Sequence, residues 1–173
     1  GPVISTAQRD KVNGYIDIGV AEGAKIFAQA DLPDDPRLAA GYYVKPTLFT
    51  GVTSSMRVAQ EEIFGPVTCV LAFDSDDEAV DIANGTQFGL VAGVYSKDLE
   101  HAHSIARRLD CGMVLVNNYF RSMIGSPFGG TKSSGFGREH HASTLLEFSY
   151  PKAIRVPSGR TPIRRWRAQD KLR

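Results

Sequence analysis

The residues best suited to chemistry lie together in the stretch 59–67, AQEEIFGPV, where two adjacent carboxylates precede a large aromatic side chain. An exposed helix can carry adjacent glutamates without cost. It would not normally place a phenylalanine beside them and then end at Gly65-Pro66. The pattern of Glu61, Glu62 and Phe64 therefore predicts that a carboxylate and a ring are held in one fixed loop. The kind of ligand they would bind has to be inferred from the rest of the sequence.

A second candidate site is the glycine-rich stretch 117–139, NNYFRSMIGSPFGGTKSSGFGRE, which follows a strand-like run. Glycines let the backbone approach a ligand or another chain closely, and long loops after buried strands often carry function in α/β proteins. The alternative is a flexible surface loop. We favour a binding loop, because a merely flexible loop would not place Phe120, Phe128 and Phe136 among its glycines.

Several familiar sites are missing from the sequence. GGTKSSG lacks the spacer and the final Gly-Lys-Ser/Thr of a phosphate-binding loop, and no dinucleotide-binding fingerprint follows a strand. His101 and His103 do not share a face of the expected helix, and His140 and His141 are adjacent, so neither pair has metal-ligand spacing. We expect no metal site, nucleophile elbow or catalytic triad.

The composition is that of an ordinary soluble globular protein, with 173 residues of which 42% are hydrophobic and 23% charged. This length suits one domain with a substantial core. No apolar run reaches the roughly 18–20 residues of a membrane span, and no signal peptide is visible. Cys69 and Cys111 lie in strand-like apolar runs, so we expect reduced core cysteines in a cytoplasmic protein.

The charge is uneven along the chain. Residues 160–173 carry six Lys/Arg and one Asp, whereas the rest of the chain is mildly acidic. A basic tail could bind nucleic acid or an anionic surface. We favour a solvated extension that packs on a neighbouring domain or subunit, because an acidic body makes nucleic-acid binding unlikely.

The first third of the sequence predicts a helix, two strands and a loop. Ser5 can cap a helix that ends near Gly23 and has apolar residues at helical spacing. AKIFAQ reads as a short strand and residues 31–41 as a surface loop. YYVKPTLFTGV looks extended, and Pro46 makes it an edge strand or a loop-like strand, because proline is normally confined to sheet edges.

The middle of the sequence alternates strands and helices. GPVTCVLAFD, GLVAGVYS and GMVLVNN read as buried strands, with helices between them capped by Ser75 and Asp98. This order predicts an α/β fold with a mostly parallel sheet and crossover helices. A further helix is expected over residues 138–149, followed by an extended segment over residues 150–156.

Three stretches together resemble the C-terminal part of the catalytic domain of the NAD(P)-dependent aldehyde dehydrogenase superfamily. They are the opening GPVISTAQRDKVNGYIDIGVAEGAK, EEIFGPV and PFGGTKSSGFGRE, and the likeness runs in order from Gly1 to about Val156. The resemblance implies that residues 1–156 form part of a three-layer α/β catalytic domain with a mostly parallel sheet and crossover helices. Only the basic tail, residues 157–173, lies outside it.

The resemblance also implies a role for the first candidate site. Glu62 would accept hydrogen bonds from the hydroxyls of the nicotinamide ribose, since a carboxylate can take both hydroxyls of a cis-diol through strong charge-assisted bonds. Phe64 would flank the nicotinamide ring of NAD or NADP. Glu61 is expected to be merely solvated.

For the glycine-rich loop, the resemblance implies contacts to an aldehyde substrate. Phe128 is similar to an aromatic residue that lines the aldehyde tunnel, and Glu139 to a carboxylate of a proton relay. Phe120 is a further candidate for the tunnel, although the family varies around it. Lys132 is expected to be structural.

The family's catalytic cysteine, general base and dinucleotide-binding domain would all precede Gly1. The chain thus resembles part of an enzyme that oxidises an aldehyde to a carboxylic acid through a cysteine thioester, and alone it is expected to be inactive. Its partners would be the missing N-terminal domain and a second copy of the chain. Residues 150–156 are expected either to pair with that second copy, which we favour, or to be poorly ordered. The alternative is a stand-alone, non-catalytic binding module derived from this fold.

Overall fold

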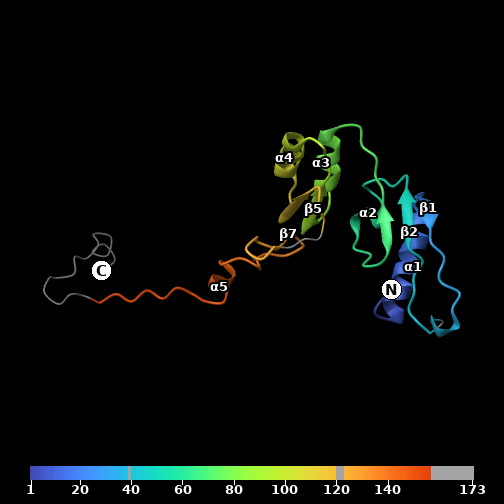
Figure 1. Ribbon diagram of the computed structural model, residues 1–173, viewed down its shortest axis with the longest axis horizontal. Helices are drawn as coiled ribbons and strands as arrows, with labels where there is room; N and C mark the ends of the chain where they lie inside the picture. The colour runs from blue at the N-terminus through green and yellow to red at the C-terminus, as the bar shows by residue number, and fades with distance from the viewer. Residues whose placement is uncertain (39, 120–122, 157–173) are drawn as a thin grey trace, which may run out of the picture.

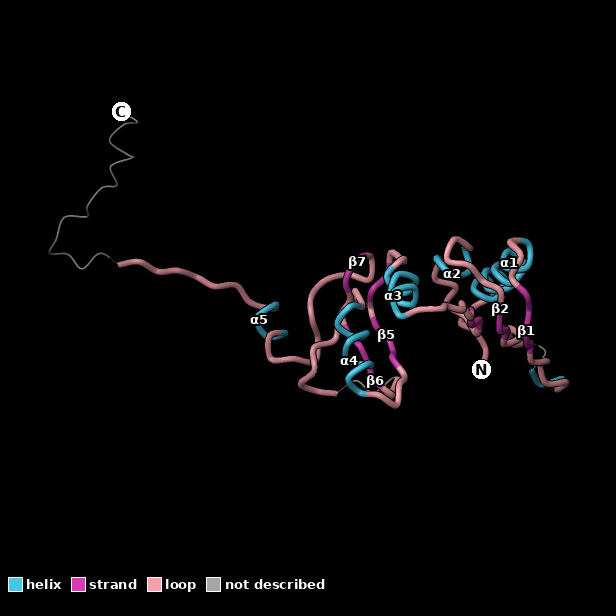
Figure 2. The backbone as a smooth tube through the Cα atoms, turned by 90° about the horizontal axis from the view of Figure 1, so that it is seen from above, coloured by secondary structure: helices cyan, strands magenta, loops and turns pink. Residues whose placement is uncertain are grey.

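In the computed structural model, which describes residues 1–38, 40–119 and 123–156, the chain forms two lobes followed by an open C-terminal segment (Figure 1). The first lobe comprises residues 1–69 and the second residues 75–140, and Figure 2 shows them side by side. Phe120 and the basic tail, residues 157–173, lie outside the described residues. Within the described part of the chain, no helix is both long and apolar enough to cross a membrane.

The first lobe opens with helix α1, Thr6–Ala21. The Ser5 side chain accepts a hydrogen bond from the Gln8 amide at 3.2 Å, which satisfies one of the free amides of the first turn. Gly23 follows the C-cap residue with a φ of +101°, a conformation that ends helices and that glycine adopts readily. The predicted start and end of this helix are both confirmed.

The sheet of the first lobe contains β1 (Lys25–Gln29), β2 (Thr47–Thr50) and β3 (Val67–Cys69). β2 is the central strand, antiparallel to β1 and parallel to β3. The prediction of an edge or loop-like strand there is wrong for β2, because Pro46 lies just before the ladder and its missing amide costs no strand hydrogen bond. Along the sequence, the 3-10 helix η1, Pro36–Leu38, lies between β1 and β2, and helix α2, Arg57–Gln60, lies between β2 and β3.

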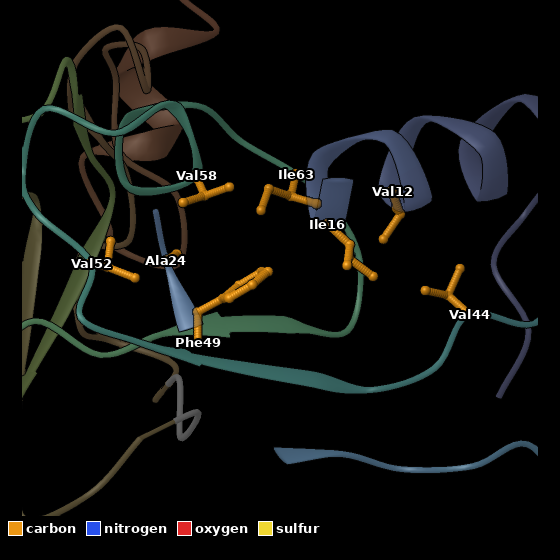
Figure 3. Packing of buried hydrophobic residues seen from close by; sticks show 8 residues of the cluster. All are labelled: Val12, Ile16, Ala24, Val44, Phe49, Val52, Val58 and Ile63. Atoms are coloured by element: carbon orange, nitrogen blue, oxygen red, sulfur yellow. The ribbon is translucent and has the colours of Figure 1, made fainter. Parts of the chain in front are cut away.

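The core of the first lobe forms where α1 packs against this sheet (Figure 3). Phe49 on β2 and Val12 on α1 have no exposed surface. Six further apolar side chains complete the cluster, namely Ile16, Ala24, Val44, Val52, Val58 and Ile63. Burial of these side chains fixes α1 over the segment that leads from α2 into β3.

The second lobe contains helices α3 (Asp76–Asn84) and α4 (Leu99–Arg108) beside short strands. Ser75 accepts a hydrogen bond from the Glu78 amide, and Asp98 caps α4 by accepting one from the His101 amide. Both predicted caps are confirmed. Two surface contacts join the helices: the His101 ring nitrogen Nε2 lies 2.7 Å from the Asp76 carboxylate, and Arg108 forms an ion pair with Asp77.

The strands of the second lobe are β4 (Phe88–Gly89), β5 (Val91–Val94), β6 (Met113–Val116) and β7 (Thr131–Lys132). β5 and β6 pair in parallel, and β4 pairs with β7 antiparallel. The α/β class with parallel strand pairs is confirmed. The expected single sheet through β3, β5 and β6 is not formed among the described residues, because β3 pairs with β2.

The C-terminal segment contains much less helix than predicted. Only Thr144–Glu147 forms a helix, α5, because Glu139 is still engaged in an extended bridge with Phe128. Residues 150–156 have no strand assignment, and they lead away from both lobes (Figure 1). Their pairing with a second copy therefore stays a prediction.

Candidate functional site

The loop after α2 carries Glu62 and Phe64 on the surface of the first lobe. Glu62 is exposed, and its carboxylate has no hydrogen bond or ion pair within the described ranges. Phe64 is 72% exposed, whereas Ile63 between them is buried in the core. The two predicted side chains thus project from a loop that is anchored through its middle residue.

Phe64 has a φ of +57°, in the left-handed region that aromatic residues rarely adopt. Such a conformation costs on the order of 1–3 kcal/mol and persists only where the surroundings enforce it. An exposed aromatic side chain on a strained backbone is typical of a binding site, and it matches the expectation of a ring held in a fixed loop.

Glu61 is not merely solvated, so that prediction is wrong. Its carboxylate accepts two hydrogen bonds of 2.9 Å from the Arg57 guanidinium and one of 2.5 Å from the Tyr15 hydroxyl. These bonds, with Arg57 the larger cause, lower the pKa of the Glu61 carboxyl to about 2. The same contact to Glu61 raises the pKa of Tyr15.

Helix α1 also reaches the backbone of this loop. The Gln8 carboxamide donates to the carbonyls of Ile63 (3.1 Å) and Phe64 (2.9 Å), and the Lys11 ammonium donates to the carbonyl of Glu62 (3.0 Å). Sequence reasoning missed these contacts because they join residues more than 50 positions apart. The only local signal was that Gln8, Lys11 and Tyr15 share one face of α1 through three- and four-residue spacing.

The glycine-rich loop places Phe128 and Glu139 opposite each other. Each donates its backbone amide to the other's carbonyl, at 3.0 and 2.7 Å. Phe128 is half-buried and its ring stacks on His140, with centroids 5.5 Å apart, whereas Glu139 is exposed. Phe128, His140 and Tyr119 line a pocket of about 230 Å³ with apolar side chains of β5 and β6.

Two cations hold the glycine-rich loop in shape. The Lys132 ammonium donates to the carbonyls of Asn84 (2.9 Å) and Thr86 (3.2 Å) at the end of α3. The Arg138 guanidinium donates to the carbonyls of Gly130 (2.8 Å) and Gly137 (2.7 Å). These contacts are structural, as expected for Lys132, and they leave the Phe128 pocket open.

The structure does not unite the predicted site residues in one cavity. A groove of about 580 Å³ between the lobes is lined by Glu62 on one side and by Ser133 and Ser134 of the glycine-rich loop on the other. Phe128 lines the separate apolar pocket, and the two cavities share Leu90 and Val91 as a wall. Glu62 and Phe128 therefore lie on opposite sides of one strand region.

The two cysteines are half-buried rather than fully buried. Burial is the main cause that raises the pKa of each thiol. Cys69 donates to the Val58 carbonyl at 3.4 Å and Cys111 to the Met113 carbonyl at 3.3 Å. Neither has the lowered pKa of a reactive nucleophile. Across the described ranges, no group of His, Cys, Asp and Glu side chains is arranged to hold a metal ion.

The free groups of the first-lobe loop fit a nicotinamide nucleotide. The unpartnered Glu62 carboxylate can accept hydrogen bonds from a ribose diol, and the exposed Phe64 ring offers a flat apolar surface to a heteroaromatic ring. The second carboxylate, Glu61, is already saturated by Arg57 and Tyr15. Of the two adjacent carboxylates, Glu62 is thus the one whose oxygens are free within the described residues.

Known proteins are similar to this chain in sequence. The model of the aldehyde dehydrogenase family matches residues 1–154. Aldehyde dehydrogenase citD of Monascus ruber is 52% identical over 166 residues, which are 96% of this chain and 33% of that protein. The betaine aldehyde dehydrogenase of Mesorhizobium japonicum is 46% identical over 159 residues, 92% of this chain and 33% of the relative. The chain thus spans about a third of the length of these curated relatives.

Solved structures share the fold. A Mycobacterium tuberculosis aldehyde dehydrogenase complexed with NAD+ superposes with a TM-score of 0.85 and 38% identity, covering 94% of this chain and 33% of the other. A Staphylococcus aureus betaine aldehyde dehydrogenase in complex with NAD+ gives a TM-score of 0.81 and 41% identity, over 86% of this chain and 29% of the other. With its sequence, its motifs and its fold in agreement, the chain belongs to the aldehyde dehydrogenase family.

Proposed function

We propose that this chain is the C-terminal portion of an NAD(P)-dependent enzyme that oxidises an aldehyde to a carboxylic acid through a cysteine thioester. One observation carries the proposal: the loop of EEIFGPV presents a free carboxylate and an exposed ring on an anchored backbone. The Mycobacterium tuberculosis and Staphylococcus aureus relatives, whose structures contain NAD+, support the cofactor.

In this proposal, Glu62 accepts hydrogen bonds from the nicotinamide ribose and Phe64 flanks the nicotinamide. When bound, NAD+ or NADP+ accepts the hydride of the aldehyde. The task of the chain is orientation. A fixed carboxylate and a fixed ring hold the acceptor in one position relative to the substrate, and this removes part of the entropy cost of the reaction.

The second lobe supplies substrate contacts in the same proposal. Phe128 forms an apolar wall for the aldehyde, and its half-burial against His140 keeps that wall in place. The exposed carboxylate of Glu139, directly across the backbone bridge, would hold and pass a proton. Phe120, which the structure does not describe, stays a further candidate for the tunnel.

The nucleophile and the dinucleotide-binding domain are not supplied by these 173 residues in our proposal. Cys69 and Cys111 are committed to backbone carbonyls and have raised thiol pKa values. We infer that the isolated chain is inactive, that its partners are a dinucleotide-binding domain and a second copy of the chain, and that it acts in the cytoplasm.

The proposal is tested in a hybrid subunit, in which this chain replaces the matching third of the Mesorhizobium japonicum betaine aldehyde dehydrogenase. We expect the hybrid to oxidise betaine aldehyde with NAD+. Glu62→Gln should lower its kcat/KM roughly ten- to over a hundredfold, since a lost charge-assisted hydrogen bond costs about 1.5–3 kcal/mol.

Glu100→Gln is the matched control, because Glu100 lies exposed on α4, away from both cavities. A folded hybrid in which Glu62→Gln and Glu100→Gln are equally active would refute the cofactor role of Glu62. The inference of inactivity would be refuted if the isolated 173-residue chain oxidised an aldehyde with NAD+ and a substitution of one of its own residues abolished that activity.

A further inference from the structure

We propose that Gln8 on helix α1 is a positioning residue for the cofactor loop, residues 61–65. Its carboxamide holds two consecutive carbonyls so that the Glu62 carboxylate and the Phe64 ring face outward together. The inference rests on the proposed function, because it assigns to Gln8 a part in orienting the groups that would bind the nicotinamide nucleotide.

The carboxamide of Gln8 contacts two consecutive backbone carbonyls of the loop. In an extended chain, successive carbonyls point to opposite sides, so one side-chain amide cannot reach two in a row. Gln8 reaches the carbonyls of both Ile63 and Phe64, at 3.1 and 2.9 Å. The left-handed φ of Phe64 is the feature that departs from an extended chain and lets both carbonyls converge on one amide. The hydrogen bonds of Gln8 and the strained backbone of Phe64 thus support each other.

Helix α1 contacts the loop at every position. Gln8 holds Ile63 and Phe64 through their carbonyls, and other α1 residues hold the remaining three positions. These further contacts are Tyr15 with the Glu61 carboxylate, Lys11 with the Glu62 carbonyl, and Val12 packed so closely on Gly65 that a Cβ there would lie 2.5 Å from a Val12 methyl.

The pattern of these contacts differs from ordinary packing. At Glu62 and Phe64, α1 binds only backbone carbonyls, and within the described residues their side chains are left without hydrogen-bond or ring partners. A contact that served stability alone would have no reason to keep Phe64 both strained and exposed, since each condition is unfavourable. The arrangement makes sense when those two side chains have a ligand.

The first test uses the 173-residue chain and needs no cofactor. Gln8→Glu keeps the shape of the side chain but removes its amide donor. Asn13→Asp makes the same chemical change on the exposed face of α1 and is the matched control. Backbone NMR would measure the heteronuclear NOE of Phe64 and the hydrogen exchange of the Val67 amide, which donates to the Gly65 carbonyl.

For Gln8→Glu we expect a lower heteronuclear NOE at Phe64 and roughly tenfold faster exchange at Val67, as expected when a net hydrogen bond or two are lost. Asn13→Asp should leave both unchanged. An ordered loop in Gln8→Glu, with exchange equal to that of the control, would overturn the proposal. Gln8→Met, which removes the donor without adding charge, serves if the glutamate variant does not fold.

The second test separates this inference from the proposed function. In the hybrid subunit, Gln8→Glu should lower kcat about tenfold with NAD+, leave the KM for the aldehyde unchanged and increase the deuterium isotope effect on kcat, because a misplaced acceptor slows hydride transfer. Gln8→Lys, which restores a donor, should recover part of the rate.

The outcomes for Glu62 and Gln8 decide between the two claims. If Glu62→Gln slows the hybrid and Gln8→Glu does not, the positioning inference fails and the cofactor role stands. If neither variant changes hydride transfer while loop order in Gln8→Glu is still lost, Gln8 shapes the loop but the proposed function fails.

Discussion

The two lobes differ in how completely each forms its own site. The first lobe closes a core around Phe49 and Val12, and every residue of its cofactor loop is held by α1. In the second lobe, Val80 and Ala102 are the buried hydrophobic side chains among the described residues, and the parallel pair β5–β6 is only half-buried. Parallel strands are normally covered on both faces.

The two halves of the proposed site therefore differ in how far contacts within this chain position them. The carboxylate and ring for the cofactor are positioned by contacts within the chain. The Phe128 pocket rests on strands that leave apolar surface exposed, so its final shape depends on segments that would cover β5 and β6. We therefore expect cofactor-side changes to act within this chain, and substrate-side changes to act mainly in a complete subunit.

The largest effect is expected from the core of the first lobe. Phe49→Ala should lower the free energy of unfolding by about 3–5 kcal/mol, because it opens a cavity beneath α1. Phe128→Ala, at a half-buried site of the second lobe, should cost about 1 kcal/mol, since full burial of such a side chain is worth about 1.5–3 kcal/mol. Urea unfolding of the 173-residue chain measures both. Equal losses would remove the distinction between the lobes.

A smaller effect is expected where α1 touches the cofactor loop. Gly65→Ala should destabilise the chain by about 1–3 kcal/mol, because the new methyl group would lie 2.5 Å from Val12. Gly14→Ala is the control. Gly14 lies in α1, and a Cβ added there would have no atom within 4 Å, so alanine should stabilise the chain by about 0.5–1 kcal/mol. The same sign for both substitutions, measured by thermal unfolding, would contradict the close contact.

The smallest effect concerns the ion pair of Glu61 with Arg57. The pKa of the Glu61 carboxyl is about 2 in the folded chain, below its ordinary value of 4.5. The ion pair therefore contributes its full stabilisation of the folded state at pH values above 4.5, and this contribution is lost as the pH falls from there toward about 2. Wild type should exceed Glu61→Gln in stability at neutral pH, and the difference should shrink over that interval. Chemical unfolding across this pH range tests it, and a pH-independent difference would contradict the assignment.

Tyr15→Phe isolates the other contact of Glu61, because it removes a single hydroxyl group. We expect a slightly less stable chain and a pKa of Glu61 that moves back toward its ordinary value, since the Tyr15 hydroxyl contributes to the lowering. NMR titration of the Glu61 side chain measures the pKa. No change on removal of the hydroxyl would show that Arg57 alone sets it.

Local signals in the sequence predicted local structure well. The caps at Ser5, Ser75 and Asp98 were found because each involves an amide only three residues ahead. The parallel pairing of β5 with β6 followed from the order of the elements. Glu62 and Phe64 were picked out from their types and spacing, and the resemblance then gave them roles.

Contacts between distant segments could not be predicted in this way. Glu61 looked solvated because its partner Tyr15 lies 46 residues earlier, although Arg57 four residues before it on a helix was a usable signal. Pro46 suggested an edge, because the sequence does not show that the ladder of β2 begins one residue later. A helix over all of residues 138–149 does not form, because Glu139 pairs with Phe128, and the sequence gives no local sign of this pairing.

The most direct test of the cofactor loop pairs Glu62→Gln with a change in the cofactor itself. The hybrid subunit is assayed with NAD+ and with an analogue that lacks both hydroxyls of the nicotinamide ribose. If Glu62 binds those hydroxyls, the two changes remove the same interaction and are not additive. We expect wild type to lose about tenfold or more in kcat/KM with the analogue, and Glu62→Gln to use both cofactors almost equally. A Glu62→Gln enzyme that still prefers NAD+ as strongly as wild type would contradict the central claim.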